Sequence, residues 1–61
     1  MKIYKLTAFE QDGNKLLDES FQAENDDAAQ EKGRGILEEK GLLEKAHRCT
    51  SLAGKLLLFH S

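Results

Sequence analysis

The last apolar run of the chain, Lys55 to His60, most constrains the fold, because both of its alternating faces are apolar. Successive residues of a β-strand point to opposite sides, so Leu56 and Leu58 are predicted to face one way. Leu57 and Phe59 are predicted to face the other. One helix in a chain of 61 residues can cover only one of these sides. The run therefore predicts that a partner, most simply a second copy, covers the other.

The length of the chain supports this prediction. A domain of this size buries only about 60% of its unfolded surface and is marginally stable alone. Cys49 is the only cysteine, so an internal disulfide is excluded and oligomerisation is the expected source of further stability. We expect one domain, residues 1–61, without a signal peptide or membrane span, located in the cytoplasm with Cys49 reduced.

The first half of the chain predicts a β-hairpin. Residues 2–9 carry β-branched and aromatic side chains without helical spacing, and residues 15–23 alternate between mainly apolar and mainly polar positions. Between them, Gly13 can adopt a positive φ and Asp12 can bond its own backbone.

A helix is predicted to follow, with either Asn25 or Asp27 as its N-cap. Apolar positions then recur at spacings of three and four, and Gly41 is placed to end the helix. Glycine inside a helix costs about 1 kcal/mol relative to alanine. At least one of Gly33 and Gly35 is therefore predicted to mark a close approach to the sheet.

The second half predicts another hairpin, with strands at residues 46–50 and 55–60 and a tight connection ending at Gly54. The whole pattern predicts an α+β fold in the order ββαββ, a mainly antiparallel four-stranded sheet with one helix on one face. The chain resembles small bacterial single-domain proteins, and no motif in it is specific enough to name a family.

The favoured function is a non-catalytic protein-interaction module that forms a homodimer or binds another protein. If Tyr4, Leu6 and Ala8 face the helix, Ile3 and Phe9 face outward, and burying such side chains contributes several kcal/mol. The alternative is that these hydrophobic residues lie at sheet ends or under loops. The predicted anchors are Ile3, Phe9, Leu56 and Leu58, with Leu57 and Tyr4 as alternates.

The alternative function is nucleic-acid binding through Lys45, Arg48 and Lys55 of the second hairpin. It is less favoured, because residues 10–30 hold seven acidic residues against one lysine. Those carboxylates would repel phosphates, and the chain lacks a basic stripe with interleaved aromatic residues.

His47 and Cys49 form the only pair that looks reactive, since they face the same side of a predicted strand. His60 could join them across the hairpin, but a structural zinc site needs four ligands. We interpret Cys49 as a small core residue and expect no enzymatic activity, cofactor or metal.

Overall fold

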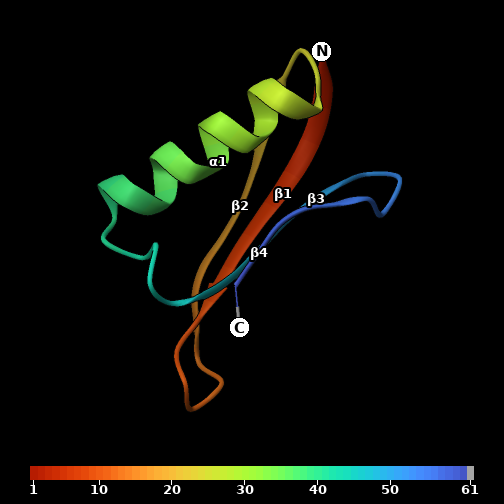
Figure 1. Cartoon of the computed structure of the whole chain (residues 1–61). Helices are drawn as coiled ribbons and strands as arrows, with labels where there is room; N and C mark the ends of the chain where they lie inside the picture. Colours follow the sequence, from red (N-terminus) through yellow and green to blue (C-terminus); the bar gives the residue numbers. More distant parts are fainter. Residues whose placement is uncertain (61) are drawn as a thin grey trace.

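The computed structural model describes residues 1–60 and shows an α+β fold in the order ββαββ (Figure 1). The strands are β1 (Lys2–Phe9), β2 (Lys15–Ala23), β3 (Ala46–Ser51) and β4 (Leu56–His60), and helix α1 spans Asp26–Glu39. The predicted fold class is therefore confirmed.

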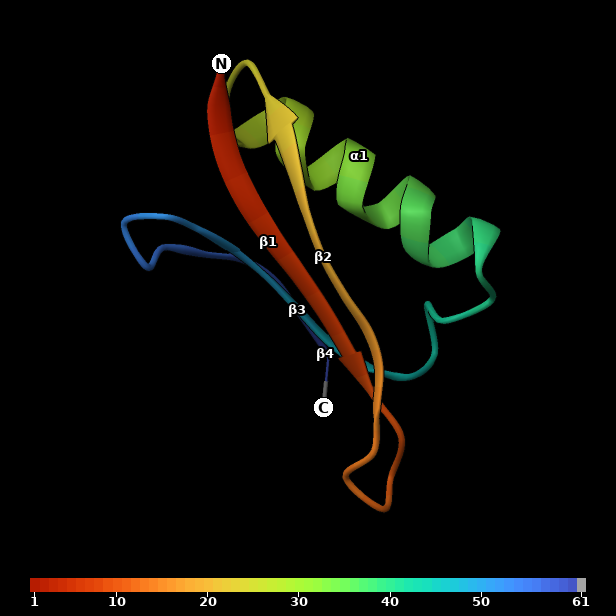
Figure 2. The same ribbon diagram turned by 180° about the vertical axis from the view of Figure 1, so that it is seen from behind.

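The four strands form one antiparallel sheet in the order β2-β1-β3-β4. The two hairpins meet through the pairing of β1 with β3, so the first strand lies inside the sheet. Figure 1 and the reverse view in Figure 2 both show α1 along one side of this sheet. The sheet thus has a helix face, which α1 covers, and an outer face, which no element of residues 1–60 covers.

The core lies on the helix face. Tyr4, Leu6 and Ala8 of β1 have no exposed surface, and they alternate along the strand with more exposed residues, as predicted. The other buried apolar residues are Leu17, Phe21, Ala23, Ala29, Leu37 and Cys49. The helix face is therefore apolar and shielded from solvent along the middle of the sheet.

Both ends of α1 are capped by local hydrogen bonds. Asn25 is the N-cap, because its side-chain oxygen accepts a 2.8 Å hydrogen bond from the Ala28 amide. At the other end, Gly41 adopts a φ of 71° and the Leu42 amide donates to the Leu37 carbonyl at 2.7 Å. This six-to-one bond is the Schellman motif that glycine permits.

The two glycines inside α1 have different surroundings. A Cβ on Gly33 would lie 3.3 Å from Leu58 Cδ1 and 3.6 Å from Cys49 Sγ, whereas a Cβ on Gly35 would meet nothing within 4 Å. The prediction of a close approach to the sheet is confirmed for Gly33.

The register of β4 corrects the predicted faces of the last strand. Its pairing with β3 shifts between Cys49 and Thr50, so that Leu58 lies opposite Cys49 and Leu56 lies opposite Thr50. Leu57 is the extra residue, and such a bulge breaks the alternation of side chains. The prediction that Leu56 and Leu58 share a face is therefore wrong.

The bulge divides the four apolar residues of β4 into a partly buried pair and an exposed pair. Leu57 and Leu58 are partly buried and pack against the core. Leu56 and Phe59 are 49% and 59% exposed. Leu58 and the alternate anchors Leu57 and Tyr4 therefore belong to the core and are not available on the outer face.

Candidate functional site

The outer face carries most of the exposed large apolar side chains of the strands. Ile3 is 42% exposed, Leu16 41%, Leu56 49% and Phe59 59%, and Phe9 is half-buried. The outward positions of Ile3 and Phe9 match the prediction. Alternation along residues 15–23 places Leu16 on the mainly polar side of its strand, opposite the buried Leu17, and Leu16 is not among the predicted anchors. A leucine on an otherwise polar side was the signal that could have found it.

A polar band crosses the middle of this face and separates Ile3 from Phe9 along β1. In the middle of the sheet, Lys5 lies between Ser20 and Thr50 on the neighbouring strands. Two residues further along β1, Thr7 lies between Asp18 and Arg48 on the neighbouring strands. Ile3 precedes this band on β1 and Phe9 follows it, whereas Leu56 and Phe59 continue its two rows on β4, beside Thr50 and Arg48. The polar band therefore ends in apolar side chains at the β4 edge of the sheet.

The polar band contains charges of both signs. The Lys5 and Lys15 ammonium groups lie 3.2 and 3.0 Å from the two carboxylate oxygens of Asp18. Hydrogen bonds from Lys15 and Lys5 lower the pKa of Asp18 below its usual value. The negative charge of Asp18 is thus held among cations.

Arg48 and Phe59 form the second polar contact of this face. They are paired across β3 and β4, and the Arg48 guanidinium lies 5.6 Å from the centre of the Phe59 ring. Such a cation–π contact leaves the remaining ring surface open for an apolar contact. Phe59 also borders a shallow hollow of about 390 Å³ together with Phe9 and Ala46.

The three basic residues of the second hairpin do not form one patch. Lys45 precedes β3 and Lys55 precedes β4, so they lie at opposite ends of the hairpin. Each is paired with an acid: Lys45 Nζ lies 2.8 Å from Glu10 Oε1, and Lys55 Nζ lies 3.0 Å from an oxygen of Asp26. The structure therefore does not bring Lys45, Arg48 and Lys55 together on one surface.

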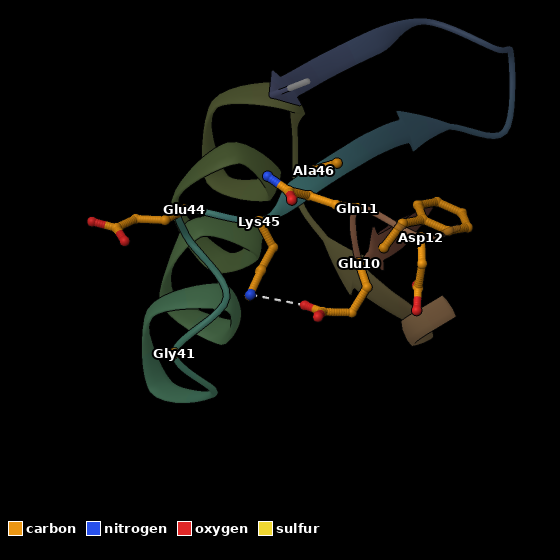
Figure 3. A pocket seen from close by; sticks show the side chains of 8 residues that line it. Glu10, Gln11, Asp12, Gly41, Glu44, Lys45 and Ala46 are labelled. Atoms are coloured by element: carbon orange, nitrogen blue, oxygen red, sulfur yellow. Dashed lines mark ion pairs between the residues drawn. The ribbon is translucent and has the colours of Figure 1, made fainter. Parts of the chain in front are cut away.

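A hollow of about 650 Å³ lies between the β1–β2 turn and the connection from α1 to β3. Figure 3 shows the ion pair of Lys45 with Glu10 beside it, and Glu44 pointing away from that pair. The hydrogen bond to Glu10 raises the pKa of Lys45, so its ammonium group stays charged. Within residues 1–60, no group of three or more histidine, cysteine or acidic side chains is placed to hold a metal ion.

His47 and Cys49 both face the helix side, as their spacing predicts. The Cys49 side chain has no exposed surface, and burial raises the pKa of its thiol. Reactive cysteines require the opposite shift, because the thiolate is the nucleophile. The arrangement agrees with the interpretation of Cys49 as a core residue.

The comparisons with known proteins identify a family. Residues 1–61 match the family described as YhzD-like protein. The chain belongs to this family. It is 47% identical over 60 residues to the Bacillus subtilis (strain 168) protein described as "Uncharacterized protein YhzD", and the match covers 98% of each chain. No solved structure matches the chain.

The YhzD-like match agrees with the predicted resemblance to small bacterial proteins. In the part of the chain that the structure describes, no helix has the length and apolar character needed to cross a membrane.

Proposed function

We propose that this protein is a small non-catalytic interaction module that binds a second copy of itself through the outer face. The observation that carries the proposal is the exposure of four large apolar side chains on one face of a two-layer domain. These are Ile3, Leu16, Leu56 and Phe59. In this proposal the protein acts in the cytoplasm, where Cys49 stays reduced.

A second copy is the favoured partner because the outer face is complementary to itself. It presents Lys5, Arg48 and the carboxylate of Asp18 in one band, with Ile3 beside that band and Leu56 and Phe59 at its β4 edge. A two-fold axis places the same surface on both partners, so opposite charges can face each other when the apolar side chains of the two copies meet.

The size of the outer face also suits a dimer. The two longer dimensions of the molecule are 33 and 22 Å, whose product is about 700 Å². Standard interfaces bury about 800 Å² per partner. Burying the exposed half of an apolar side chain contributes on the order of 1 kcal/mol to the free energy of association. Such a contribution matters because a chain of this length is only marginally stable alone.

Sedimentation equilibrium over a wide range of protein concentration tests the proposal. The wild type should approach twice its monomer mass of 6.9 kDa at high concentration. Replacing Leu56 and Phe59 together by serine should shift the protein toward the monomer. His60→Ser is the matched control, because His60 is an exposed residue of the same strand that pairs with His47 on the helix face.

Two results would contradict the proposal. One is a wild-type protein that stays monomeric at several hundred micromolar, and the other is a control that dissociates as readily as the double variant. A titration with single-stranded DNA examines the alternative function. Binding that weakens steeply as salt rises, and that requires Arg48, would favour nucleic-acid recognition instead.

A further inference from the structure

A hollow of about 240 Å³ lies on the helix face, between the second half of α1 and the end of the β3–β4 hairpin. Its apolar lining consists of three leucines and one phenylalanine: Leu37, Leu43, Leu58 and Phe59. Its ionisable lining consists of Arg34, His47 and His60, and no acidic side chain of residues 1–60 lines it. In this respect it differs from the hollow lined by Glu10 and Glu44.

The three basic side chains come from three elements and meet at this hollow. His47 and His60 lie directly opposite each other across β3 and β4, with ring centres 5.5 Å apart. Arg34 is an exposed residue of α1, and within residues 1–60 it forms no ion pair. Among the described residues, no carboxylate therefore occupies its guanidinium.

His47 is held in one orientation by the backbone. Its Nδ1 lies 2.9 Å from the carbonyl oxygen of Lys45, and the residue is 8% exposed. Because a carbonyl oxygen can only accept, Nδ1 carries a proton in this contact. Nε2 is then the ring nitrogen whose protonation can change, and it donates a hydrogen bond only when the ring is an imidazolium.

We propose that this hollow, the anion pocket, binds a small organic anion. The oxyanion, a carboxylate or a phosphate, would contact Arg34 and the two histidines, and the apolar part of the ligand would contact the leucines. A planar guanidinium matches two oxygens of either group, and hydrogen bonds between charged partners are the stronger ones. The small volume limits the ligand to a short apolar group.

A divalent metal ion fits the same residues less well. The pocket offers two nitrogen ligands without a carboxylate, and Arg34 would add an unfavourable positive charge beside the ion. A metal site and an anion site also predict opposite effects of pH at His47. A metal needs an unprotonated Nε2, whereas an anion needs a protonated one.

Anion binding is therefore coupled to proton uptake. An oxyanion interacts more favourably with imidazolium than with neutral imidazole, so affinity should rise as pH falls. The groups that face His47 are Arg34 from α1 and His60 from β4, and the neighbouring Ala8 of β1 does not titrate. Both titratable neighbours are basic, so a bound anion would supply the opposite charge that favours a protonated ring. On β3 itself, Cys49 is buried and neutral.

NMR titration of the full chain tests the proposal with two probes, hexanoate and inorganic phosphate. The ring signals of His47 and His60 should shift saturably with at least one probe, and binding should be several-fold tighter at about pH 6 than at about pH 8. A response to hexanoate alone identifies a carboxylate ligand. A response to phosphate alone identifies a phosphate ligand.

Variants with exposed side chains locate the site without disturbing the core. Arg34→Gln should weaken binding about tenfold or more, and Arg34→Lys should restore part of the loss. Lys40→Gln is the matched control, because it removes one positive charge from an exposed residue just beyond α1, outside the pocket. It should leave the affinity unchanged.

Three outcomes would overturn the proposal. The first is the absence of saturable shifts with either probe. The second is an equal loss of affinity in the Arg34 and Lys40 variants, which would indicate a general charge effect. The third is tighter binding of Zn²⁺ at about pH 8 than at about pH 6, at the same histidines and without anion binding.

Discussion

The buried phenol of Tyr4 donates a 2.8 Å hydrogen bond to Asp26 Oδ1, which connects the first strand to the first turn of α1. The other oxygen of Asp26 accepts a 3.0 Å hydrogen bond from Lys55 Nζ, just before β4. One carboxylate thus joins three segments of the chain. Hydrogen bonds from Lys55 and Tyr4 lower the pKa of Asp26, while burial and this hydrogen bond raise the pKa of Tyr4.

The lowered pKa of Asp26 predicts a loss of stability in acid. Its unfolded pKa is about 3.9, so the contribution is fully present above that pH and is lost as pH falls through the lower folded pKa. Asp26→Asn should therefore be less stable than the wild type at neutral pH and should lose less stability between about pH 5 and 2. Urea unfolding across this range, followed by circular dichroism, measures the effect.

Asp27→Asn is the control for this prediction. It removes the same charge from the same helical turn, and the structure gives Asp27 no bond to Tyr4 or Lys55. An acid-induced loss of stability as large in Asp26→Asn as in the wild type would contradict the prediction. Tyr4→Phe should also lower the neutral-pH stability, because it leaves Asp26 with one partner fewer.

The different surroundings of Gly33 and Gly35 predict opposite responses to larger side chains. Gly35→Ala should raise the free energy of unfolding by about 0.5–1 kcal/mol, because the new methyl group meets nothing and the helix gains propensity. Gly33→Leu should lower it by about 1–3 kcal/mol, because the side chain would overlap Leu58 and Cys49. Equal effects of the two substitutions on the urea midpoint would contradict this reading of the helix–sheet contact.

The order of the elements and the inward set on β1 could be predicted from the sequence. Strand alternation placed Tyr4, Leu6 and Ala8 together, and the structure buries all three. The glycine pair signalled a close approach, but only the tertiary structure selects Gly33. Local pattern also left two N-caps open, and the contact of Asn25 with the Ala28 amide decides between them.

The residues of β4 that face outward could not be predicted, because their orientation depends on how β4 pairs with β3. Alternation assumes an unbroken ladder, and nothing local to Leu56–Phe59 reveals the shift opposite Cys49 and Thr50. Leu16 differs, because alternation along β2 places it opposite the core residue Leu17, and the structure also exposes it there. Only the structure therefore assigns the apolar residues of β4 to their faces.

The burial of Cys49 predicts slow reaction with a thiol reagent. The native side chain is inaccessible and the pKa of its thiol is raised, so labelling should proceed through transient opening of the domain. The labelling rate should rise strongly in urea and should fall in the Gly35→Ala variant, which stabilises the closed state. A native rate close to that of the unfolded chain would contradict the buried position.

Cys49 also provides a test of core packing. Cys49→Ser places a hydroxyl in an apolar site beneath α1 and should lower the free energy of unfolding by about 1–3 kcal/mol. Cys49→Ala removes the sulfur without adding a polar group and should cost less. If serine is better tolerated than alanine, the surroundings of this residue are more polar than the structure shows.

A hydrogen bond from Gln30 is predicted to hold the short edge strand β4 against α1. Its side-chain amide donates a 3.0 Å hydrogen bond from α1 to the carbonyl oxygen of Leu57, the extra residue of the bulge. Gln30→Ala should lower global stability by about 1 kcal/mol, because a partly buried carbonyl loses its partner. Hydrogen exchange should accelerate more in β4 than in β1, since the lost bond anchors only the edge.

Gln30→Glu should accelerate hydrogen exchange in β4 further, because a carboxylate would face the Leu57 carbonyl without a proton to donate. Uniform acceleration across all four strands would show that this bond supports the whole sheet rather than its edge.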